Sequence, residues 1–450
     1  MANPSKNSYI SVSDLKTHNK PGDLWISIHG QVYDVSAWAP RHPGGLPLLL
    51  SHGGHDVTDA FLAYHPPSVS RLLPSLSTYL RLENHSVSAP SSDYRTLLSH
   101  FDNLGLFHTK GHTILATFVI MIASILFCLC GIFLSTSFWV HLASGVLIGF
   151  AWIQCGWLGH DSGHYKITSG KKSNRFAQVL VGNCFAGISI EWWKWNHNAH
   201  HTSCNSLDHD PDLQYIPFLV VSSKFFTSMI TSRFYNKKLN FNAMSRFLVS
   251  YQHWSFYPVM CLARVNMFLQ SLVFLFFNKE VQNRVQEILG IAVFWVWFPL
   301  VVSSLPNWGE RIMFLVASFS ITGIQQVQFS VNHFSSDVYV GPPMENDWFE
   351  KQTAGTLNIS CPTWMDWFHG GLQFQIEHHL FPRMPRSQLR KISPFVKDLC
   401  KKHNLPYKIA SFTTANVLML RTLRNVAIKA RDLSNPIPKN LVWEAFHTHG

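Results

Sequence analysis

The sequence predicts a small α+β unit at the N-terminus, fused to an all-α integral membrane domain with about four transmembrane helices and a histidine-rich cap. Three observations support this fold class. Hydrophobic residues make up 47% of the 450 residues and charged residues only 14%, which excludes a disordered chain. Long uncharged apolar runs begin well after the polar N-terminal part. Histidine is as frequent as aspartate and glutamate together, at 25 residues each.

The first soluble unit is expected to span 8–83. Its opening segment, ISVSDLKTH, predicts a short helix with a serine cap. The alternating apolar residues of LWISIHGQVYDVSAW predict two short strands joined by a turn. Short helical segments are expected after the HPGG turn at 42–45, and the polar stretch at 84–111 predicts a linker.

The membrane domain is expected to span 112–435 and to be followed by a tail at 436–450. A helix needs about 20 apolar residues to cross a bilayer. Four runs meet this length and predict spans at 113–133, 138–158, 288–305 and 312–331. Two weaker stretches, at 177–190 and 255–277, carry charges or polar breaks such as Arg264 and predict interfacial or re-entrant helices.

The distribution of charge predicts the orientation of these spans. Lys and Arg total 36 against 25 Asp and Glu, a net charge of +11, and the segment 159–287 is rich in basic residues. The positive-inside rule places this segment and both termini in the cytosol. Anionic lipid headgroups explain the positive charge better than nucleic acid, because the sequence contains no nucleic-acid-binding motif. The sequons at Asn84 and Asn358 should therefore stay unglycosylated.

Two histidines of the first unit are candidates for haem ligands. His42 lies in the HPGG turn, and His65 lies in DAFLAYHPP. If two helical turns present these side chains across a pocket, a haem iron can take one imidazole from each. The alternative is that His42 merely occupies a turn and His65 a surface helix. This unit resembles cytochrome b5, for which HPGG is a specific mark. The resemblance implies that His42 and His65 are the axial ligands of haem b.

Three histidine-rich motifs and one isolated histidine predict a metal centre at the membrane surface. Spacings of three and four residues place imidazoles on one face of a helix. A single zinc ion needs three or four ligands and would leave several histidines unexplained. Two irons with room for O2 can use the whole set, which consists of His160, His164, His197, His200, His201, His333, Gln375, His378 and His379.

Metal-bound imidazoles usually donate their second ring N–H group to an acceptor that fixes the ring. Polar residues near the motifs are candidates for this role: Asp161, Asn198, Asp208, Asp210 and Glu377. The isolated His141 is expected to be satisfied by local contacts instead. We assign no role to His209 and His369.

These motifs resemble the membrane fatty-acid desaturase superfamily. WWKWNHNAHH and HGGLQFQIEHHLFP are similar to plant members, and the glutamine that opens the third motif is similar to front-end desaturases. The resemblance implies an endoplasmic reticulum enzyme that uses O2 and two non-haem irons to insert a cis double bond. It also implies that electrons from NADH pass through a cytochrome b5 reductase to the haem. Glu191 departs from the family pattern, where a small residue is expected, and a charge there can perturb activity.

The resemblance leaves two plant substrate groups open. Delta-6 acyl-lipid desaturases act on linoleoyl and α-linolenoyl chains of membrane lipids, and delta-8 desaturases act on sphingolipid long-chain bases. Asn196 is similar to the acyl-lipid group, so we favour delta-6. Alternatives are the delta-8 enzyme, a hydroxylase on the same scaffold, and a membrane haem protein that only relays electrons. The implied partners are the lipid bilayer, a lipid substrate and the reductase, and the oligomeric state stays unassigned.

Overall fold

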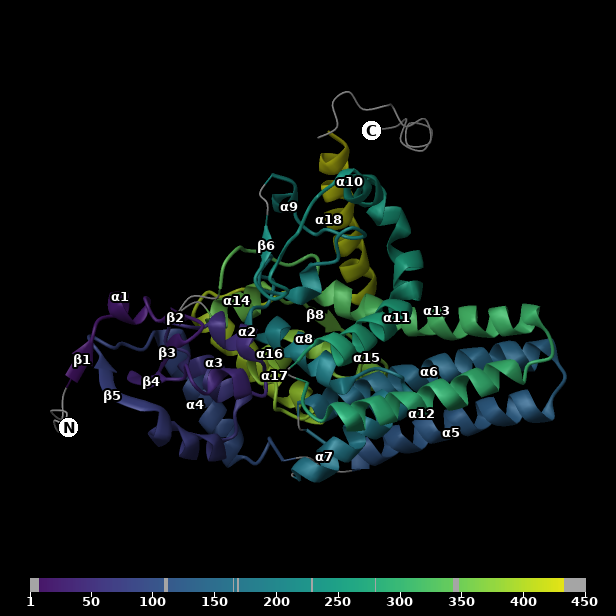
Figure 1. The fold of residues 1–450 in the computed structure, drawn as a ribbon, viewed down its shortest axis with the longest axis horizontal. Coiled ribbons are helices and arrows are strands. Elements are labelled where there is room, and N and C mark those ends of the chain that lie inside the picture. Colours follow the sequence, from purple (N-terminus) through teal and green to yellow (C-terminus); the bar gives the residue numbers. More distant parts are fainter. Residues whose placement is uncertain are drawn as a thin grey trace.

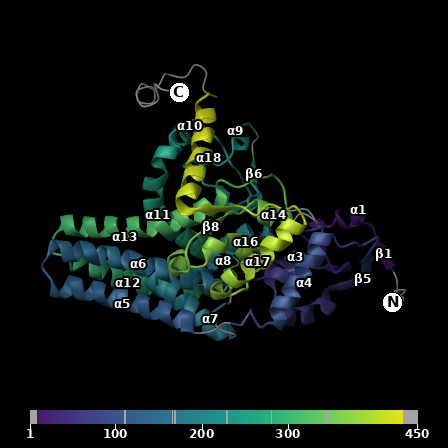
Figure 2. The same cartoon turned by 180° about the vertical axis from the view of Figure 1, so that it is seen from behind.

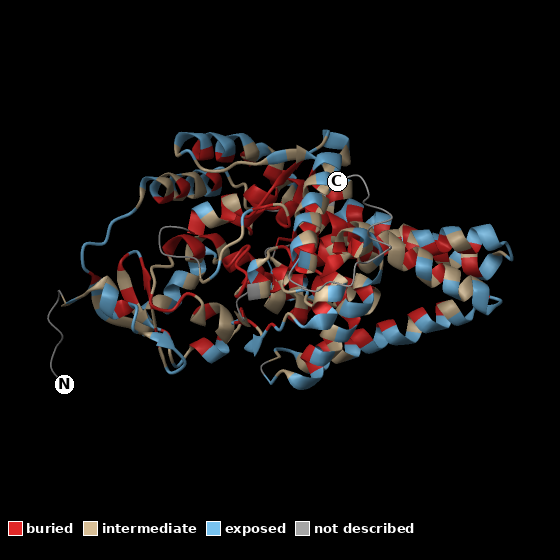
Figure 3. Ribbon diagram, turned by 90° about the horizontal axis from the view of Figure 1, so that it is seen from above, coloured by how far each residue is buried: buried red, intermediate tan, exposed pale blue. Residues whose placement is uncertain are grey.

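The computed structural model describes residues 8–108, 112–164, 166–167, 170–227, 230–279, 281–342 and 348–432. The predicted tail at 436–450 lies outside the described residues. The N-terminal unit and a group of long helices lie at opposite ends of the molecule, with a cap of shorter elements between them (Figure 1). Buried residues concentrate in this central cap (Figure 3).

The N-terminal unit contains a five-stranded sheet with the order β1-β5-β4-β3-β2. Its strands are β1 (Ser8–Ile10), β2 (Asn19–Lys20), β3 (Asp23–Ile28), β4 (Gln31–Asp34) and β5 (Ser77–Leu82). The two predicted strands are confirmed as the antiparallel hairpin β3–β4. β1 pairs with β5 in parallel, which joins segments from the two ends of the unit. Leu24, Ile26 and Ile28 alternate along β3 and are buried, as in a strand that covers a core.

The helical elements of this unit are α1 (Val12–Leu15), η1 (Ala39–Arg41), α2 (Leu46–Leu50), α3 (Thr58–Tyr64) and η2 (Pro67–Leu76). The predicted capped helix is α1, where the Ser11 side chain accepts a hydrogen bond from the Asp14 backbone N–H. The stretch expected as a linker holds α4 (Ala89–Asn103). Tyr94 and Phe101 of α4 are fully buried against the cap, so this stretch belongs to the folded core.

Five long helices are α5 (His112–Leu134), α6 (Phe138–Gly163), α11 (Gln252–Phe277), α12 (Arg284–Ser303) and α13 (Trp308–His333). Among the described residues, these five are long and apolar enough to cross a membrane. Four of them coincide with the predicted spans. α5, α6, α12 and α13 run side by side, whereas α11 turns toward α10 (Ala243–Ser250) and α18 (Phe412–Asp432) (Figures 1 and 2).

The stretch at 255–277, predicted as an interfacial or re-entrant helix, lies in α11, which is one helix of 26 residues. Arg264, which suggested a polar break, is buried, and its guanidinium carbon lies 3.8 Å from the centre of the Trp152 ring. The guanidinium also donates a hydrogen bond to the Ala186 carbonyl. The helix can continue through this charge because protein groups from α6 and the 177–190 stretch surround it.

The stretch at 177–190 begins at the end of α7 (Lys171–Gln178) and continues as a π-helical turn, η3 (Val179–Phe185). The main cap helices are α8 (Ile190–Thr202), α14 (Trp348–Ala354), α16 (Gln375–Leu380) and α17 (Arg386–Lys402). The remaining elements are η4 (Pro211–Leu213), α9 (Lys224–Thr227), β6 (Thr231–Ser232), β7 (Lys237–Lys238), β8 (Asn358–Ser360), η5 (Thr363–Met365), α15 (Asp366–His369), η6 (Leu372–Phe374) and β9 (Ile409–Ser411).

α6 and α13 pack backbone to backbone. A Cβ atom added to Gly145 would lie 3.0 Å from the Phe314 carbonyl oxygen, and one added to Gly149 would lie 2.6 Å from the Ser318 carbonyl oxygen. Small residues four positions apart allow two membrane helices to approach this closely. Because α6 ends in the first histidine motif and α13 ends at His333, their packing brings the two chemical segments to the same end of the bundle.

Candidate metal centre

The two histidines of the N-terminal unit face each other. His42 follows η1 and His65 follows α3, and their ring centres are 6.1 Å apart. A metal bound to one nitrogen of each ring at about 2 Å would hold the ring centres about 6 Å apart. His65 donates its Nδ1 hydrogen to the Phe61 carbonyl at 3.1 Å, which leaves its Nε2 free. Burial lowers the pKa of His42 to about 3, so its ring is neutral, as a metal ligand must be.

A cluster of apolar side chains adjoins this pair. Leu46, Leu48, Val57 and Phe61 form one cluster with Trp38, and Phe61 stacks on the His65 ring at 4.6 Å. Two facing neutral imidazoles beside apolar side chains have the donor set and the surroundings of a haem site. The residues present therefore fit the expected haem.

The histidine motifs meet inside the cap, next to the ends of α6 and α13. A first cluster consists of His160, His164, His197, His201 and His378, whose ring nitrogens lie within 4.8 Å of one another. Nε2 of His160 is 3.0 Å from Nε2 of His378. Nε2 of His197 is 3.1 Å from Nε2 of His164 and 3.0 Å from Nε2 of His201. Ligands bound to one metal at about 2 Å lie about 3 to 4 Å apart, so the first cluster fits a metal ion.

A second cluster consists of His200, His333, His379 and Gln375. The Nδ1 atom of each histidine has a separate partner: Asp210 at 2.9 Å for His200, the Gly355 carbonyl at 3.2 Å for His333, and Gln352 Oε1 at 2.8 Å for His379. The Nε2 atoms therefore remain for a metal. In metal-bound histidines one ring nitrogen binds the metal and the other is usually hydrogen-bonded in this way. The Gln375 amide nitrogen lies 2.9 Å from Nε2 of His333.

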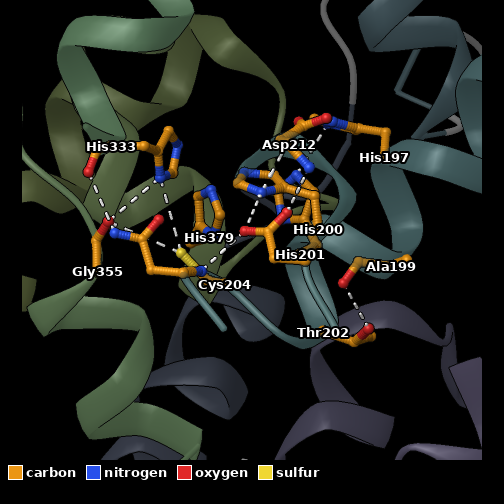
Figure 4. A network of polar contacts seen from close by, with 12 residues as sticks. His197, Ala199, His200, His201, Thr202, Cys204, Asp212, His333, Gly355 and His379 are labelled. Atoms are coloured by element: carbon orange, nitrogen blue, oxygen red, sulfur yellow. Dashed lines mark hydrogen bonds and ion pairs between the residues drawn. The ribbon is translucent and has the colours of Figure 1, made fainter. Parts of the chain in front are cut away.

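The two clusters adjoin each other. The rings of His201 and His379 stack at 4.3 Å between their centres, and the His200 and His201 rings are 5.7 Å apart (Figure 4). Every residue predicted to bind the two irons is thus buried in one continuous group of side chains, apart from the half-buried His164.

Cys204 also lies beside the second cluster. Its Sγ is 3.8 Å from Nδ1 of His333, the nitrogen that already bonds the Gly355 carbonyl (Figure 4). Burial raises the pKa of the Cys204 thiol well above its usual value, so the group is a neutral thiol rather than a thiolate. Cys204 therefore packs behind the His333 ring.

Two of the acidic residues expected to orient the rings reach them. Asp210 binds His200, and Asp161 Oδ1 lies 3.5 Å from Nδ1 of His160. Arg386 holds the other oxygen of Asp161 at 3.1 Å. Burial by itself lowers the pKa of His200, but the carboxylates of Asp210 and Asp212 raise it to about 9. These carboxylates give the second cluster a local field that favours a cation.

Three other predicted orienting residues are placed differently. Asp208 accepts a hydrogen bond from the Gly341 backbone N–H at 2.8 Å, which fixes a loop. Glu377 accepts from Asn358 Nδ2 at 2.8 Å and from the Tyr407 hydroxyl. Asn198 contributes its backbone carbonyl to Thr202. Neighbouring positions on a helix point about 100° apart, so Glu377 and Asn198 do not share the face of the adjacent histidines.

Sequence reasoning missed three polar residues that contact the rings. Gln352 binds His379 through Oε1 and donates to the His201 carbonyl at 2.8 Å. Lys166 Nζ is 3.2 Å from Nδ1 of His378, and Asp212 Oδ2 is 3.8 Å from Nδ1 of His200. None of the three lies three or four residues from a motif histidine, as a ligand on the same helix face would. The sequence around Gln352 therefore contains no signal for its role. The acidic run LDHDPD was a signal for Asp212.

The unusual Glu191 is charge-compensated. Its carboxylate lies 2.7 Å from Arg175 Nη1 and 3.4 Å from Lys194 Nζ. Arg175 also binds the fully buried Glu287 at 2.8 Å. The negative charge expected to perturb the metal centre is therefore tied into a buried ion-pair network at the start of α8.

Known proteins resemble this chain over its whole length. Residues 137–411 match the fatty acid desaturase family, and residues 11–87 match the cytochrome b5-like heme/steroid binding domain. An acyl-lipid (9-3)-desaturase of Borago officinalis is 61% identical over 442 residues, 98% of both chains. Delta(8)-fatty-acid desaturase 2 of Arabidopsis thaliana is 58% identical over 453 residues, 100% of both chains. A delta(8)-fatty-acid desaturase of Borago officinalis is 55% identical over 442 residues, 98% of this chain and 99% of that relative. The two histidine sites and these matches together show that the chain belongs to the fatty acid desaturase family and carries a cytochrome b5-like domain at its N-terminus.

Proposed function

We propose that the chain is a front-end desaturase of the delta-6 type, which inserts a cis double bond into linoleoyl and α-linolenoyl chains of membrane lipids. The observation that carries this proposal is the convergence of the three motifs and His333 on two adjoining clusters, beside a domain with a haem-type histidine pair. The 61% identity to the acyl-lipid (9-3)-desaturase of Borago officinalis supports an acyl substrate.

Family membership implies haem, two irons and O2. His42 and His65 would hold the haem, and the two clusters would hold one iron each. The irons, when bound, supply with O2 the oxidising power to remove hydrogen from an unactivated methylene group, which no side-chain base can do. The chain itself orients the rings through Asp210, Gln352 and the Gly355 carbonyl. Electrons would enter from NADH through a reductase that acts on the haem domain.

A cavity beside His160 is our candidate for part of the acyl path. Its volume is about 60 Å³, and it lies between α6, η3, α11 and α13. Its lining includes Trp152, Cys155, Gly159, Ala186 and Met267. Mostly apolar walls with a few polar groups are typical of sites for apolar ligands. An acyl chain in this cavity would pass next to a ligand of the first cluster.

The product identifies the activity. A host strain that expresses the chain is fed linoleate and makes phytosphingosine-containing lipids, and both lipid pools are analysed by mass spectrometry. We expect γ-linolenate to appear in the acyl pool. A delta-8 long-chain base without γ-linolenate would overturn the delta-6 assignment, and a hydroxylated chain would indicate a hydroxylase. Unchanged lipids with an intact haem spectrum would indicate an electron relay.

We further propose an endoplasmic reticulum protein with four spans, α5, α6, α12 and α13, and with both termini and the metal centre in the cytosol. The position of α11 supports four spans. Its first residue, Gln252, bonds Val220 and Leu423 of the cap, and Phe274 near its other end packs on Trp195 of α8. The next helix, α12, begins where Gln286 bonds Arg175 of α7. Both ends of α11 thus lie on the cap side of the bundle.

The labelling of introduced cysteines tests this topology. In sealed microsomes, a membrane-impermeant maleimide should label Lys279→Cys, which lies between α11 and α12, but not Trp308→Cys at the far end of the bundle until detergent is added. Labelling is compared with that of the unsubstituted chain. Protection of Lys279→Cys would mean that α11 crosses the membrane. The sequon at Asn84 is exposed and reports on topology, whereas Asn358 is 3% exposed and bonded to Glu377, so its lack of a glycan reports nothing.

A further inference from the structure

We infer that the haem domain is docked on the cap in one fixed position, and that Tyr64 is the residue that connects its haem site to the iron site. The inference rests on the proposed function, in which haem passes electrons to the irons. The alternative for a fused domain is a flexible tether, which would act by raising the local concentration of the haem. The contacts between the haem domain and the cap distinguish these two arrangements.

The first contact is apolar. Ala60 and Ala63 of α3 are 8% and 2% exposed, and they share a buried cluster with Trp348 of α14 and with Ile376 and Leu380 of α16. α16 carries the third histidine motif. The haem-domain helix that ends next to His65 is therefore packed into the same core as α16, which carries three of the candidate iron ligands.

The second contact is polar and directed. Arg383, between α16 and α17, donates through Nε to the Ala63 carbonyl at 3.1 Å and through Nη2 to the Leu62 carbonyl at 3.4 Å. These carbonyls belong to the last turn of α3, where a positive charge is favourable. In the first turn of α3, Asp59 pairs with Arg95 of α4 at 2.6 Å. The Arg383 hydrogen bonds and the Asp59–Arg95 ion pair together fix the rotation of α3 about its own axis.

The haem-binding turn makes a third contact. Gly45 of HPGG has a φ of +85°, and a Cβ atom added to it would lie 3.2 Å from Cδ1 of Trp195 in α8. Glycine at this position therefore allows both the left-handed backbone conformation and the close approach of α8, which carries the second histidine motif. The cap thus contacts the haem domain at the start of α2, near His42, and along α3, next to His65. The haem domain therefore turns the side that carries both haem histidines toward the cap.

Tyr64 joins the two metal sites directly. It precedes His65, and its hydroxyl donates a hydrogen bond to the His201 carbonyl at 2.8 Å. The His201 ring packs edge-on against the Tyr64 ring at 6.2 Å. Gln352 donates to the same carbonyl and also binds His379. A route from His65 to His201 thus consists of covalent bonds and one hydrogen bond.

In the proposed step, one electron leaves the ferrous haem, which becomes ferric, and enters a ferric non-haem iron, which becomes ferrous. No proton moves, and Tyr64 is not itself oxidised. Electron transfer slows steeply with each through-space gap, so replacement of the Tyr64–His201 hydrogen bond by a van der Waals contact should slow this step. Tyr64 is a positioning residue in this scheme, because it acts through the ligands on either side.

The test of the route uses Tyr64→Phe in the full-length protein with haem and iron bound. The haem is reduced anaerobically with NADH and cytochrome b5 reductase, and its reoxidation is followed by absorbance after mixing with O2 and lipid substrate. We expect reoxidation to slow several-fold, with the rate of haem reduction and the haem spectrum unchanged. The matched control is Tyr94→Phe, which removes a similar buried hydroxyl that donates to the Leu380 carbonyl at 2.7 Å. Equal reoxidation rates in wild type and Tyr64→Phe would overturn the route.

The test of docking does not depend on turnover. A protease site is placed between the exposed residues Ser86 and Val87, and the cleaved membranes are sedimented. We expect the haem domain to stay with the membranes and Arg383→Glu to release it, with haem content equal in both. Release of the haem domain from the chain with Arg383 intact would show a tether and overturn docking. If no desaturated lipid forms while docking holds, the proposed function fails and the interface stands.

Discussion

Replacement of His333 by alanine is expected to eliminate desaturation while the haem domain stays intact. His333 lies apart from the three motifs in sequence, but its Nε2 faces Gln375 in the second cluster and its Nδ1 is held by Gly355. Loss of partners that merely orient a metal ligand typically costs 10-fold to 100-fold in metal affinity or activity, so loss of the ligand should cost at least about 100-fold. Iron analysis should find two non-haem irons per wild-type chain and fewer in His333→Ala.

The control for His333 is another buried histidine of the cap. His369 is 2% exposed and contacts Gln328 at 3.4 Å, outside both clusters. His369→Ala should keep its iron and its activity within about threefold, as expected for a loss of under 1 kcal/mol in transition-state stabilisation. Retention of two irons and of activity by His333→Ala would remove this residue from the iron site.

Replacement of Gln352 by leucine is expected to produce the second large effect. Leucine has a similar size but can neither accept a hydrogen bond from His379 Nδ1 nor donate one to the His201 carbonyl. The single substitution therefore removes one hydrogen bond from each cluster. Iron affinity should fall about 10-fold to 100-fold, because the His379 ring is no longer fixed. Titration of the metal-free protein with ferrous iron measures the change.

Two variants separate this effect from the loss of a buried amide. Gln388 is 3% exposed in α17 and is placed in neither cluster, so Gln388→Leu should bind iron normally. Gln352→Glu keeps an oxygen for His379 and should lose less affinity than Gln352→Leu. If both Gln352 variants bind iron as the wild type does, the amide has no role in holding the rings.

The local parts of this architecture were predictable from the sequence. A haem-type histidine pair, four long apolar helices and histidines at helical spacing each depend on residues close together in the chain. The parallel pairing of β1 with β5 was not predictable in this way, because its partners come from opposite ends of the haem domain. The burial of Arg264 in α11 was not predictable, because the aromatic ring and the carbonyl that it contacts lie far away in the sequence.

The metal centre shows the same division. Most candidate ligands were found from their spacing, and His333 was found from its place just past the fourth apolar run. Asp210 was one of five candidate orienting residues, and the structure identifies His200 as its partner. Gln352 acts on residues 27 and 151 positions away, and Tyr64 acts across 137 positions, so no short pattern contains either pair. Asp208 and Glu377 lie near the motifs in sequence, yet they bind other groups because neighbouring residues point in different directions.

The contact of α6 with α13 through Gly145 and Gly149 has a consequence for the chemistry at its end. Each helix is a rigid rod that carries a ligand of a different cluster at its last turn, His160 in one case and His333 in the other. The distance between α6 and α13 is short, because carbonyl oxygens of α13 leave no room for a methyl group on either glycine. This distance therefore sets how far apart the two clusters lie. Two glycines buried between α6 and α13, far from the histidine clusters in sequence, thus act as a spacer for the candidate iron site.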